Sequence, residues 1–340
     1  MSKRHLTDAI LASGTAVIRD VPKSDMHNHC LLGGRRSIIE QFYGRKLPPF
    51  RSGRSGIADL NHWIFSQYRP FYDLPGAFEK AVEAAFRQAL HDGVTVLEMS
   101  IDVFFARKLM IPPNRVVEVL DSTHKKLAPS VEFRPELGFP RTHPAKTTLD
   151  VLLPFFSTGY FRSIDMYDDE NIQPVSEFRE VYRAARQMGL KCKAHVGEFG
   201  DGASELTYMG LALQSHLTCK AHVGEFGDGA SVREAVEILA LDAVQHGIGA
   251  ADSPEVMRWI ADRRTVVNVC PASNIRLKRV RSYKTHPIRI LFDHGIRVTI
   301  NTDDALVFGV GNSEQYLRLY RSGLFSAGEL EEIRRNGMQE

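Results

Sequence analysis

The sequence has little cysteine, no long apolar run and almost no net charge. Four cysteines in 340 residues are too few for a disulfide framework, and two of them, Cys192 and Cys219, belong to one duplicated segment. No stretch of about 18 apolar residues predicts a membrane-spanning helix, and no apolar core of signal-peptide length follows the N-terminus. A formal net charge of +2 gives no electrostatic reason to expect nucleic acid or a membrane surface as a partner. We therefore predict a cytoplasmic protein.

Helical and extended segments alternate along the chain. Residues 1–20 predict a lead-in helix, and residues 44–76, rich in Gly, Pro, Arg and aromatics, predict an elaborated loop after the first strand. Eight strands are predicted, at residues 23–29, 94–100, 131–136, 161–166, 190–195, 243–246, 266–270 and 297–301. Alternation of this kind predicts an α/β fold, a (β/α)₈ barrel forming one domain over residues 1–340. No glycine-rich phosphate fingerprint follows a strand, which disfavours a Rossmann fold.

One segment occurs twice without any change. Residues 192–204 recur letter for letter at residues 219–231, which indicates a recent or engineered duplication and not a solenoid period. We expect only one copy to supply the fifth barrel strand, so either residues 205–231 or residues 192–218 would be the duplicated insertion. The second copy keeps a short connection to the helix predicted at 232–239 and to His246, whereas the first keeps its connection to the preceding helix. This favours the second copy without excluding the first.

Residues that can bind a metal ion lie at the ends of predicted strands. His27 and His29 alternate in an extended segment, so both imidazoles point to one side. Polar side chains at other strand ends are His222 with Glu225 (or His195 with Glu198), His246, Asp303 and Asp304. Strand ends meet at one rim of a barrel, so two histidines of the first strand, the repeat histidine and one aspartate predict a His₃Asp site. Such a site suits zinc with an open position for water, and His246 and the repeat glutamate are candidates for proton transfer.

Six short motifs carry a resemblance to a known family. The chain resembles the adenosine/AMP deaminase branch of the metal-dependent amidohydrolase superfamily. The matching segments follow the family order, at residues 23–29, 222–225 (or 195–198), 245–249, 270–274, 285–288 and 300–305. The resemblance implies hydrolytic deamination of a small 6-aminopurine such as adenosine, in which water adds to C6 and ammonia leaves to give inosine.

The resemblance also implies a role for each matching residue. One Zn²⁺ per chain would be held by His27, His29, His222 (or His195) and Asp303. Glu225 (or Glu198) would protonate the purine ring nitrogen, His246 would orient or deprotonate the attacking water, and Asp304 would accept a hydrogen bond at the imidazole edge of the purine.

Two positions depart from the family pattern, and both concern substrate binding. Leu31 stands where an Asp usually contacts the ribose 5′-hydroxyl, and Asp168 stands where a Gly usually contacts the purine. The substrate therefore stays open between adenosine and another aminopurine. Two other hypotheses remain: the barrel hydrolyses another bond, or the duplication leaves an inactive or purely ligand-binding barrel. Whether the chain forms a homo-oligomer is also open. Cys270 and His286 are interpreted as packing residues.

Overall fold

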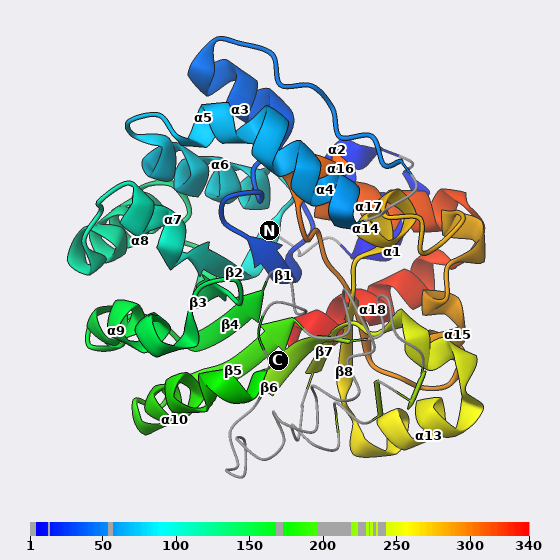
Figure 1. Ribbon diagram of the computed structural model, residues 1–340. Coiled ribbons are helices and arrows are strands. Elements are labelled where there is room, and N and C mark those ends of the chain that lie inside the picture. Colours follow the sequence, from blue (N-terminus) through cyan, green and yellow to red (C-terminus); the bar gives the residue numbers. More distant parts are fainter. Residues whose placement is uncertain are drawn as a thin grey trace.

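Nine parallel strands form one sheet in chain order and wrap into a barrel (Figure 1). The computed structural model describes residues 5–12, 14–53, 57–167, 173, 175–195, 219–223, 229–230, 232–233, 236 and 243–339. The strands are β1 (Lys23–His29), β2 (Val94–Asp102), β3 (Glu132–Pro140), β4 (Ser163–Tyr167), β5 (Lys191–His195), β6 (Cys219–Val223), β7 (Ala243–His246), β8 (Val266–Val269) and β9 (Val298–Ile300). A bridge between Asn28 and Asp303 joins β1 to the segment that follows β9. The predicted α/β barrel is confirmed.

The sheet holds one strand more than predicted because both copies of the repeat form strands. β5 and β6 lie side by side in parallel, with Cys192 opposite Cys219 and His195 opposite His222. The expectation that only one copy forms a barrel strand is therefore wrong. The physical reason is that identical sequences have identical strand propensity, so local sequence gives neither copy an advantage.

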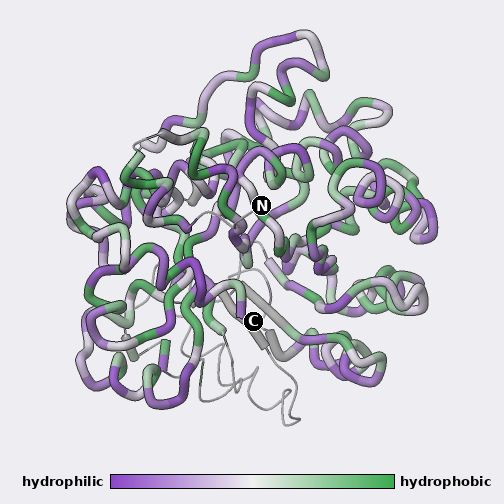
Figure 2. The backbone as a smooth tube through the Cα atoms, turned by 180° about the vertical axis from the view of Figure 1, so that it is seen from behind, coloured by the Kyte–Doolittle hydropathy of each residue, from purple (hydrophilic) through white to green (hydrophobic). Residues whose placement is uncertain are grey.

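Helices cover the outside of the barrel (Figure 1). The main layer consists of α6 (Ala77–His91), α8 (Pro113–Leu127), α9 (Ala145–Phe156), α10 (Arg179–Gln187), α13 (Pro254–Arg263), α15 (Ile288–Asp293), α17 (Asn312–Arg321) and α18 (Ala327–Met338). Apolar and polar residues alternate along these helices (Figure 2); α6, for example, buries Phe78, Val82 and Phe86 at helical spacing. Shorter elements follow several strands, namely α7 (Val103–Lys108), η2 (Val175–Phe178), η3 (Ile248–Asp252), α14 (Pro271–Arg276), η4 (Tyr283–Thr285) and α16 (Ala305–Phe308).

The lead-in segment is helical, in two short pieces instead of one. α1 (Leu6–Leu11) and α2 (Thr15–Arg19) are separated near Gly14, whose extended backbone begins α2. The α1 helix packs on α18, and the backbone N–H of Leu6 donates to Glu331 Oε2 at 3.2 Å. The start of the chain is thus held against the last helix. Among the described residues, no helix has the length and apolar character needed to cross a membrane.

The elaborated loop predicted at residues 44–76 follows α3 (Arg36–Tyr43) and is helical in its second half. This half contains α4 (Ile57–Trp63), the π-helical turn η1 (Ile64–Tyr68) and α5 (Arg69–Tyr72). Its aromatic side chains pack on one another: Trp63 stacks on Tyr68, with ring centroids 6.2 Å apart, and Tyr68 meets Tyr72 edge to face at 5.2 Å. This packing explains why so many aromatic residues occur in one loop.

A buried lysine, Lys23, anchors the start of β1. The ammonium of Lys23 donates to the backbone carbonyls of Ile18 at 2.7 Å and Val21 at 2.5 Å. Burial lowers the pKa of Lys23 to about 7, although the nearby Asp92 carboxylate opposes the shift. In the unfolded chain the pKa of a lysine is about 10.4. Above about pH 7 the unfolded chain therefore binds a proton that the folded chain has released, and folding becomes more favourable as the pH rises.

We predict that Lys23→Met removes this pH dependence. Between pH 7 and 9, the free energy of unfolding of the wild type should rise relative to that of the variant, by up to about 1.4 kcal/mol per pH unit. Urea denaturation at pH 7, 8 and 9 measures the difference. Lys46→Met is the matched control, because the Lys46 side chain is 91% exposed. A difference in the free energy of unfolding between the wild type and Lys23→Met that stays constant from pH 7 to pH 9 would contradict the prediction.

Candidate metal centre and active site

Side chains, together with the single bridge, close the barrel between β1 and β9. Thr302 donates twice to the buried carboxylate of Asp25, from its backbone N–H at 3.0 Å and from its hydroxyl. The backbone N–H of Met26 donates to Asn301 Oδ1 at 2.8 Å. The backbone N–H of Asp303 donates to the carbonyl of His27 at 3.0 Å. These bonds fix Asp303 beside the end of β1.

The carboxylate of Asp25 is held in this network despite its burial. Burial raises the pKa of Asp25 to about 7, while the hydrogen bonds from Thr302 act in the opposite direction. Asn28 Nδ2 donates to the Thr302 hydroxyl at 2.9 Å, which orients that hydroxyl toward Asp25. The three side chains thus form one polar chain under the rim of the barrel.

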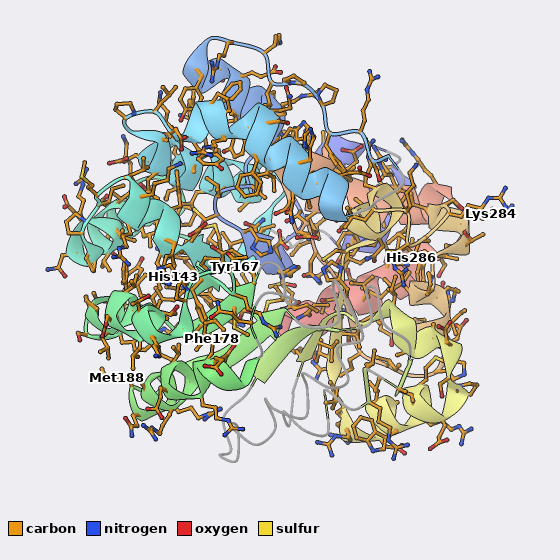
Figure 3. All side chains as sticks on the ribbon, in the orientation of Figure 1. His143, Tyr167, Phe178, Met188, Lys284 and His286 are labelled. Atoms are coloured by element: carbon orange, nitrogen blue, oxygen red, sulfur yellow. The ribbon has the colours of Figure 1, made fainter. Side chains whose placement is uncertain are left out.

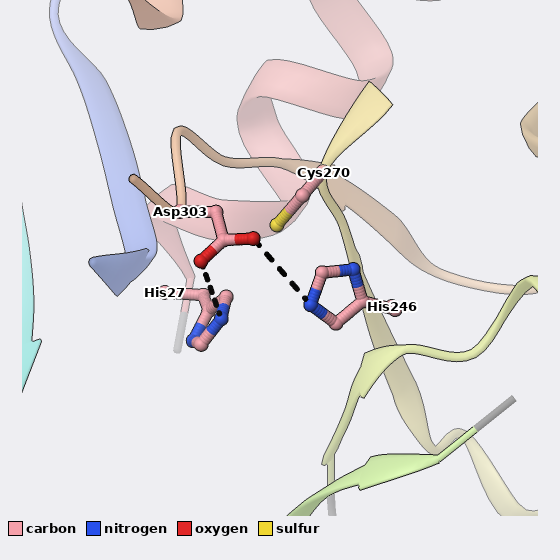
Figure 4. Close-up of side chains that lie close together, drawn as sticks. All are labelled: His27, His246, Cys270 and Asp303. Atoms are coloured by element: carbon pink, nitrogen blue, oxygen red, sulfur yellow. Dashed lines mark ion pairs between the residues drawn. The ribbon is translucent and has the colours of Figure 1, made fainter. Parts of the chain in front are cut away.

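Three imidazoles surround the carboxylate of Asp303. Its Oδ1 lies 3.5 Å from His27 Nε2 and 3.6 Å from His29 Nε2, and its Oδ2 lies 3.8 Å from His246 Nε2. Figure 4 shows His27 and His246 on either side of the carboxylate. His27, His246 and Asp303 are at most 6% exposed. The structure therefore brings together four residues singled out from the sequence, from β1, from β7 and from the segment after β9.

Two members of this cluster have left-handed backbone conformations. His246 has φ of 60° and Asp303 has φ of 57°. This conformation is unfavourable for residues with a Cβ atom and persists where the surrounding structure enforces it, frequently at functional sites. At Asp303 the bridge to Asn28 and the bond to the His27 carbonyl supply that constraint.

Asn274 fixes the orientation of His246, a role that the sequence interpretation missed. Asn274 lies in α14, directly after β8, and its Nδ2 is 3.2 Å from His246 Nδ1. An amide NH₂ only donates hydrogen bonds, so Nδ1 accepts and the ring proton is assigned to Nε2, which faces Asp303. The signal was present in the sequence, since Asn274 ends the family-like segment 270–274.

Cys270 also lies closer to the cluster than expected. Its thiol sulfur belongs to a group with His27, His246 and Asp303 whose potential ligand atoms all lie within 4.8 Å of one another. The side chain is fully buried, as a packing residue should be. Its position next to the imidazoles nevertheless makes it a neighbour of any ion bound there (Figure 4).

The donor set fits a divalent transition metal. Neutral imidazoles and a carboxylate are typical zinc ligands, and donors around a tetrahedral zinc lie roughly 3.3 Å apart. The contacts of 3.5, 3.6 and 3.8 Å around Asp303 are close to that spacing. A second, overlapping group consists of His29, Asp303 and Asp304. The chemistry and the spacing of these residues both suit zinc.

Asp304 is buried at the same rim. It occupies the N-cap position of α16, yet its side chain makes no capping hydrogen bond, which argues against a purely local turn role.

Leu31 is half-buried, and its carbonyl accepts a hydrogen bond from the Tyr68 hydroxyl at 3.0 Å.

Other predicted residues are described only in part. His195 and His222 end or nearly end adjacent strands, and only their backbone is described. Glu198, Glu225 and Asp168 lie outside the described residues.

His286 is buried and belongs to neither group of potential metal ligands found among the described residues. Its Nδ1 accepts a hydrogen bond from the backbone N–H of Ile288 at 3.1 Å, and burial lowers its pKa to about 3. Figure 3 shows exposed Lys284 at the edge of the molecule and His286 further in. These features are those of a neutral packing residue.

Comparison with known proteins identifies the family. A sequence model described as adenosine deaminase matches residues 203–340. The chain is 32% identical to a "putative adenosine/adenine deaminase" of Treponema pallidum, over 91% of this chain and 94% of that protein. The chain belongs to the adenosine deaminase family. It is thus a metal-dependent hydrolytic deaminase of purines.

Further relatives and solved structures agree. The deaminase is 27% identical to an adenine deaminase of Rhodopseudomonas palustris, over 95% of this chain and 90% of that protein. Its fold matches the crystal structure of an adenine deaminase from Arthrobacter aurescens, with a TM-score of 0.72, 21% identity and coverage of 94% and 93% of the two chains. It also matches an amidohydrolase from Burkholderia ambifaria with bound Zn, with a TM-score of 0.73, 20% identity and coverage of 96% and 87%. These two structures share the barrel fold.

We predict that Asn274→Ala lowers the kcat of the deaminase about 10- to 100-fold, because His246 loses the contact that sets its tautomer. Asn274→Asp should lose as much, since a carboxylate of the same shape cannot donate to Nδ1. Steady-state kinetics across pH 6–9 and the melting temperature of each variant test this positioning role. Asn114→Ala, at an exposed position, should leave kcat unchanged. Full activity in Asn274→Asp would contradict the inference that Asn274 must donate to Nδ1 of His246.

Proposed function

We propose that this chain is a single-domain, zinc-dependent deaminase that hydrolyses the exocyclic amino group at C6 of an aminopurine and releases ammonia. The observation that carries the proposal is the arrangement of His27, His29 and His246 around the carboxylate of Asp303. One zinc ion per chain would be held by His27, His29, His222 and Asp303. The distances from Asp303 Oδ1 to the Nε2 atoms of His27 and His29 are close to the separation of ligand atoms around a tetrahedral zinc ion.

Each remaining polar group has a task in this reaction. A bound zinc ion would supply a water molecule that is activated near neutral pH. His246, whose Nε2–H faces Asp303, donates a hydrogen bond that orients that water. Of the two protons that the water gives up, one would pass through Glu225 to the ring nitrogen and the other would leave with the amino group as ammonia. Asp304 accepts a hydrogen bond at the imidazole edge of the purine, and Glu225 protonates the ring nitrogen next to C6. Protonation of the ring and departure of ammonia complete the substitution at C6.

Two observations support the second repeat copy as the source of the third histidine ligand. The family match over residues 203–340 contains the whole of the second copy, 219–231, and only the end of the first. In addition, β6 is the direct neighbour of β7, with Val223 opposite His246. We therefore assign His222 and Glu225 to the site and regard residues 192–218 as the inserted segment; His195 and Glu198 are the alternative pair.

The two copies can be separated by mutation. We expect His222→Ala to lose most bound zinc and all measurable deaminase activity, because a buried site then lacks one of its ligands. His195→Ala, its matched control at the same register on the neighbouring strand, should keep both. Elemental analysis of zinc and ammonia release are the readouts. The reverse pattern would assign the first copy to the site, and activity in both single variants would show that either copy can serve.

The choice between adenosine and the free base adenine turns on Leu31. A leucine side chain cannot accept a hydrogen bond from a sugar hydroxyl, and the Leu31 carbonyl already accepts one from Tyr68. This favours adenine over adenosine as the substrate, with hypoxanthine as the product. Relatives of the chain include proteins named for either substrate.

We predict a higher kcat/KM with adenine than with adenosine for the zinc-loaded protein. Ammonia release measures both, and removal of zinc by a chelator should abolish turnover until zinc is restored. Absence of ammonia from every aminopurine tested would overturn the proposal. An acid or alcohol product would point to hydrolysis of another bond, and far less than one zinc per chain would point to an inactive or ligand-binding barrel.

A further inference from the structure

A cavity lies between the segments that follow β1, β8 and β9. Its volume is about 520 Å³, and four arginines contribute to its lining, Arg35, Arg36, Arg51 and Arg276. The helices around it are in contact, since α16 packs against both α3 and α14. Of the candidate metal-site residues whose side chains the structure describes, His27, His29, His246 and Asp303, none lines this cavity. The cavity is therefore distinct from the described part of the candidate centre.

The positive charge of this cavity exceeds its negative charge. Glu40 and Glu314 also line the cavity. Each of them pairs with a cationic residue that lies outside the lining. Glu40 Oε2 lies 2.9 Å from Lys46 Nζ, and Glu314 Oε1 lies 2.6 Å from Arg318. Both acids are thus largely compensated by residues outside the cavity, which leaves the lining arginines in excess.

The arginines themselves are only partly engaged. Arg36 Nε lies 3.7 Å from Glu40 Oε1, on the carboxylate that Lys46 also contacts. Arg35 Nε donates to Gln88 Oε1 at 2.6 Å, and the Arg35 charge also attracts the buried Asp92 carboxylate, with which Arg35 forms no direct ion pair. Arg51 and Arg276 are exposed and form no ion pair or side-chain hydrogen bond with any residue that the structure describes. Two guanidinium groups can therefore turn toward a ligand without breaking an existing contact.

The remaining walls indicate what kind of anion fits. The α3 helix begins here, and its N-cap residue Arg35 provides no capping side chain, so the positive end of the helix dipole faces the same region. The other walls are apolar, from Phe50, Leu306, Val307 and Phe308. The volume lies within the range of small-molecule sites and is larger than an inorganic phosphate needs. Planar guanidinium groups bind phosphate oxygens in pairs.

We propose that this cavity binds a small organic phosphate, with the phosphoryl group held by Arg51 and Arg276 beside the start of α3 and the organic part against the apolar walls. The ligand joins two segments that lead away from the candidate centre. α16 begins directly after Asp304, and the Leu306 N–H donates to the Leu32 carbonyl at 2.8 Å, three residues after His29. Binding therefore stabilises the loops on which the centre depends.

Isothermal titration of the metal-loaded full chain with ribose 5-phosphate tests the proposal. This probe has no aminopurine base, so it cannot be turned over by the proposed reaction, and the double variant described below shows whether it binds in the cavity. We expect a Kd below about 1 mM at low salt that weakens as salt is added, because the contact is electrostatic. Ribose should not bind, and inorganic phosphate should bind at least about tenfold more weakly than ribose 5-phosphate, since it makes no contact with the apolar walls.

The double variant Arg51→Gln/Arg276→Gln should raise this Kd at least about tenfold. Both side chains are exposed, so the fold should persist, which circular dichroism and zinc content verify. Arg258→Gln, an exposed arginine on α13, is the matched control and should bind as the wild type does. No binding by the wild type, equal binding by the double variant, or equal binding of ribose would each overturn the proposal. None of these readouts requires deaminase activity, so the result stands apart from that of the proposed function.

Discussion

The buried contact between Asp25 and Thr302 is the constraint on which the rest of this structure depends. It joins the first strand to the segment after the last, two parts of the chain separated by 277 positions. A carboxylate in this position would be costly without partners, and Thr302 supplies two hydrogen bonds to it. Because the next residue is Asp303, the bond that closes the barrel also sets the position of the central carboxylate of the site.

The residues of the site surround the point at which the barrel closes. His27 and His29 point to one side of β1, and Asp303 meets them from the far end of the chain. His246 completes the ring from β7, and Asn274 holds its imidazole from α14. Left-handed backbone at both His246 and Asp303 shows that these side chains are positioned against local preference. Such positioning suits a centre whose groups must lie ready before substrate binds.

Much of this arrangement could be predicted from the sequence because it follows from short-range periodicity. Alternation in residues 23–29 placed two imidazoles on one side, and apolar segments separated by helices indicated a barrel whose strand ends meet at one rim. Asp303 follows a buried strand, so it could be placed at that rim as well. The proximity of His27, His29 and Asp303 could therefore be predicted from the fold alone.

Other features could not be predicted, for physical reasons. The contacts of Asn274 with His246 and of Thr302 with Asp25 depend on side-chain directions between distant segments, which periodicity does not encode. Cys270 could be recognised as buried, but not as a neighbour of the imidazoles. The two repeat copies are identical, so no local preference could show that both would form strands. The division of the lead-in helix is different, because Gly14, whose extended backbone precedes α2, is a local signal for a break that the sequence prediction did not use.

The central claim is that closure of the barrel between β1 and β9 creates one metal site around Asp303. Anomalous diffraction at the zinc absorption edge, from crystals of the zinc-loaded protein, tests it most directly. The account predicts one strong peak per chain, within about 2.0–2.2 Å of donor atoms of His27, His29 and Asp303. A peak elsewhere, or zinc bound without Asp303 as a ligand, would contradict it.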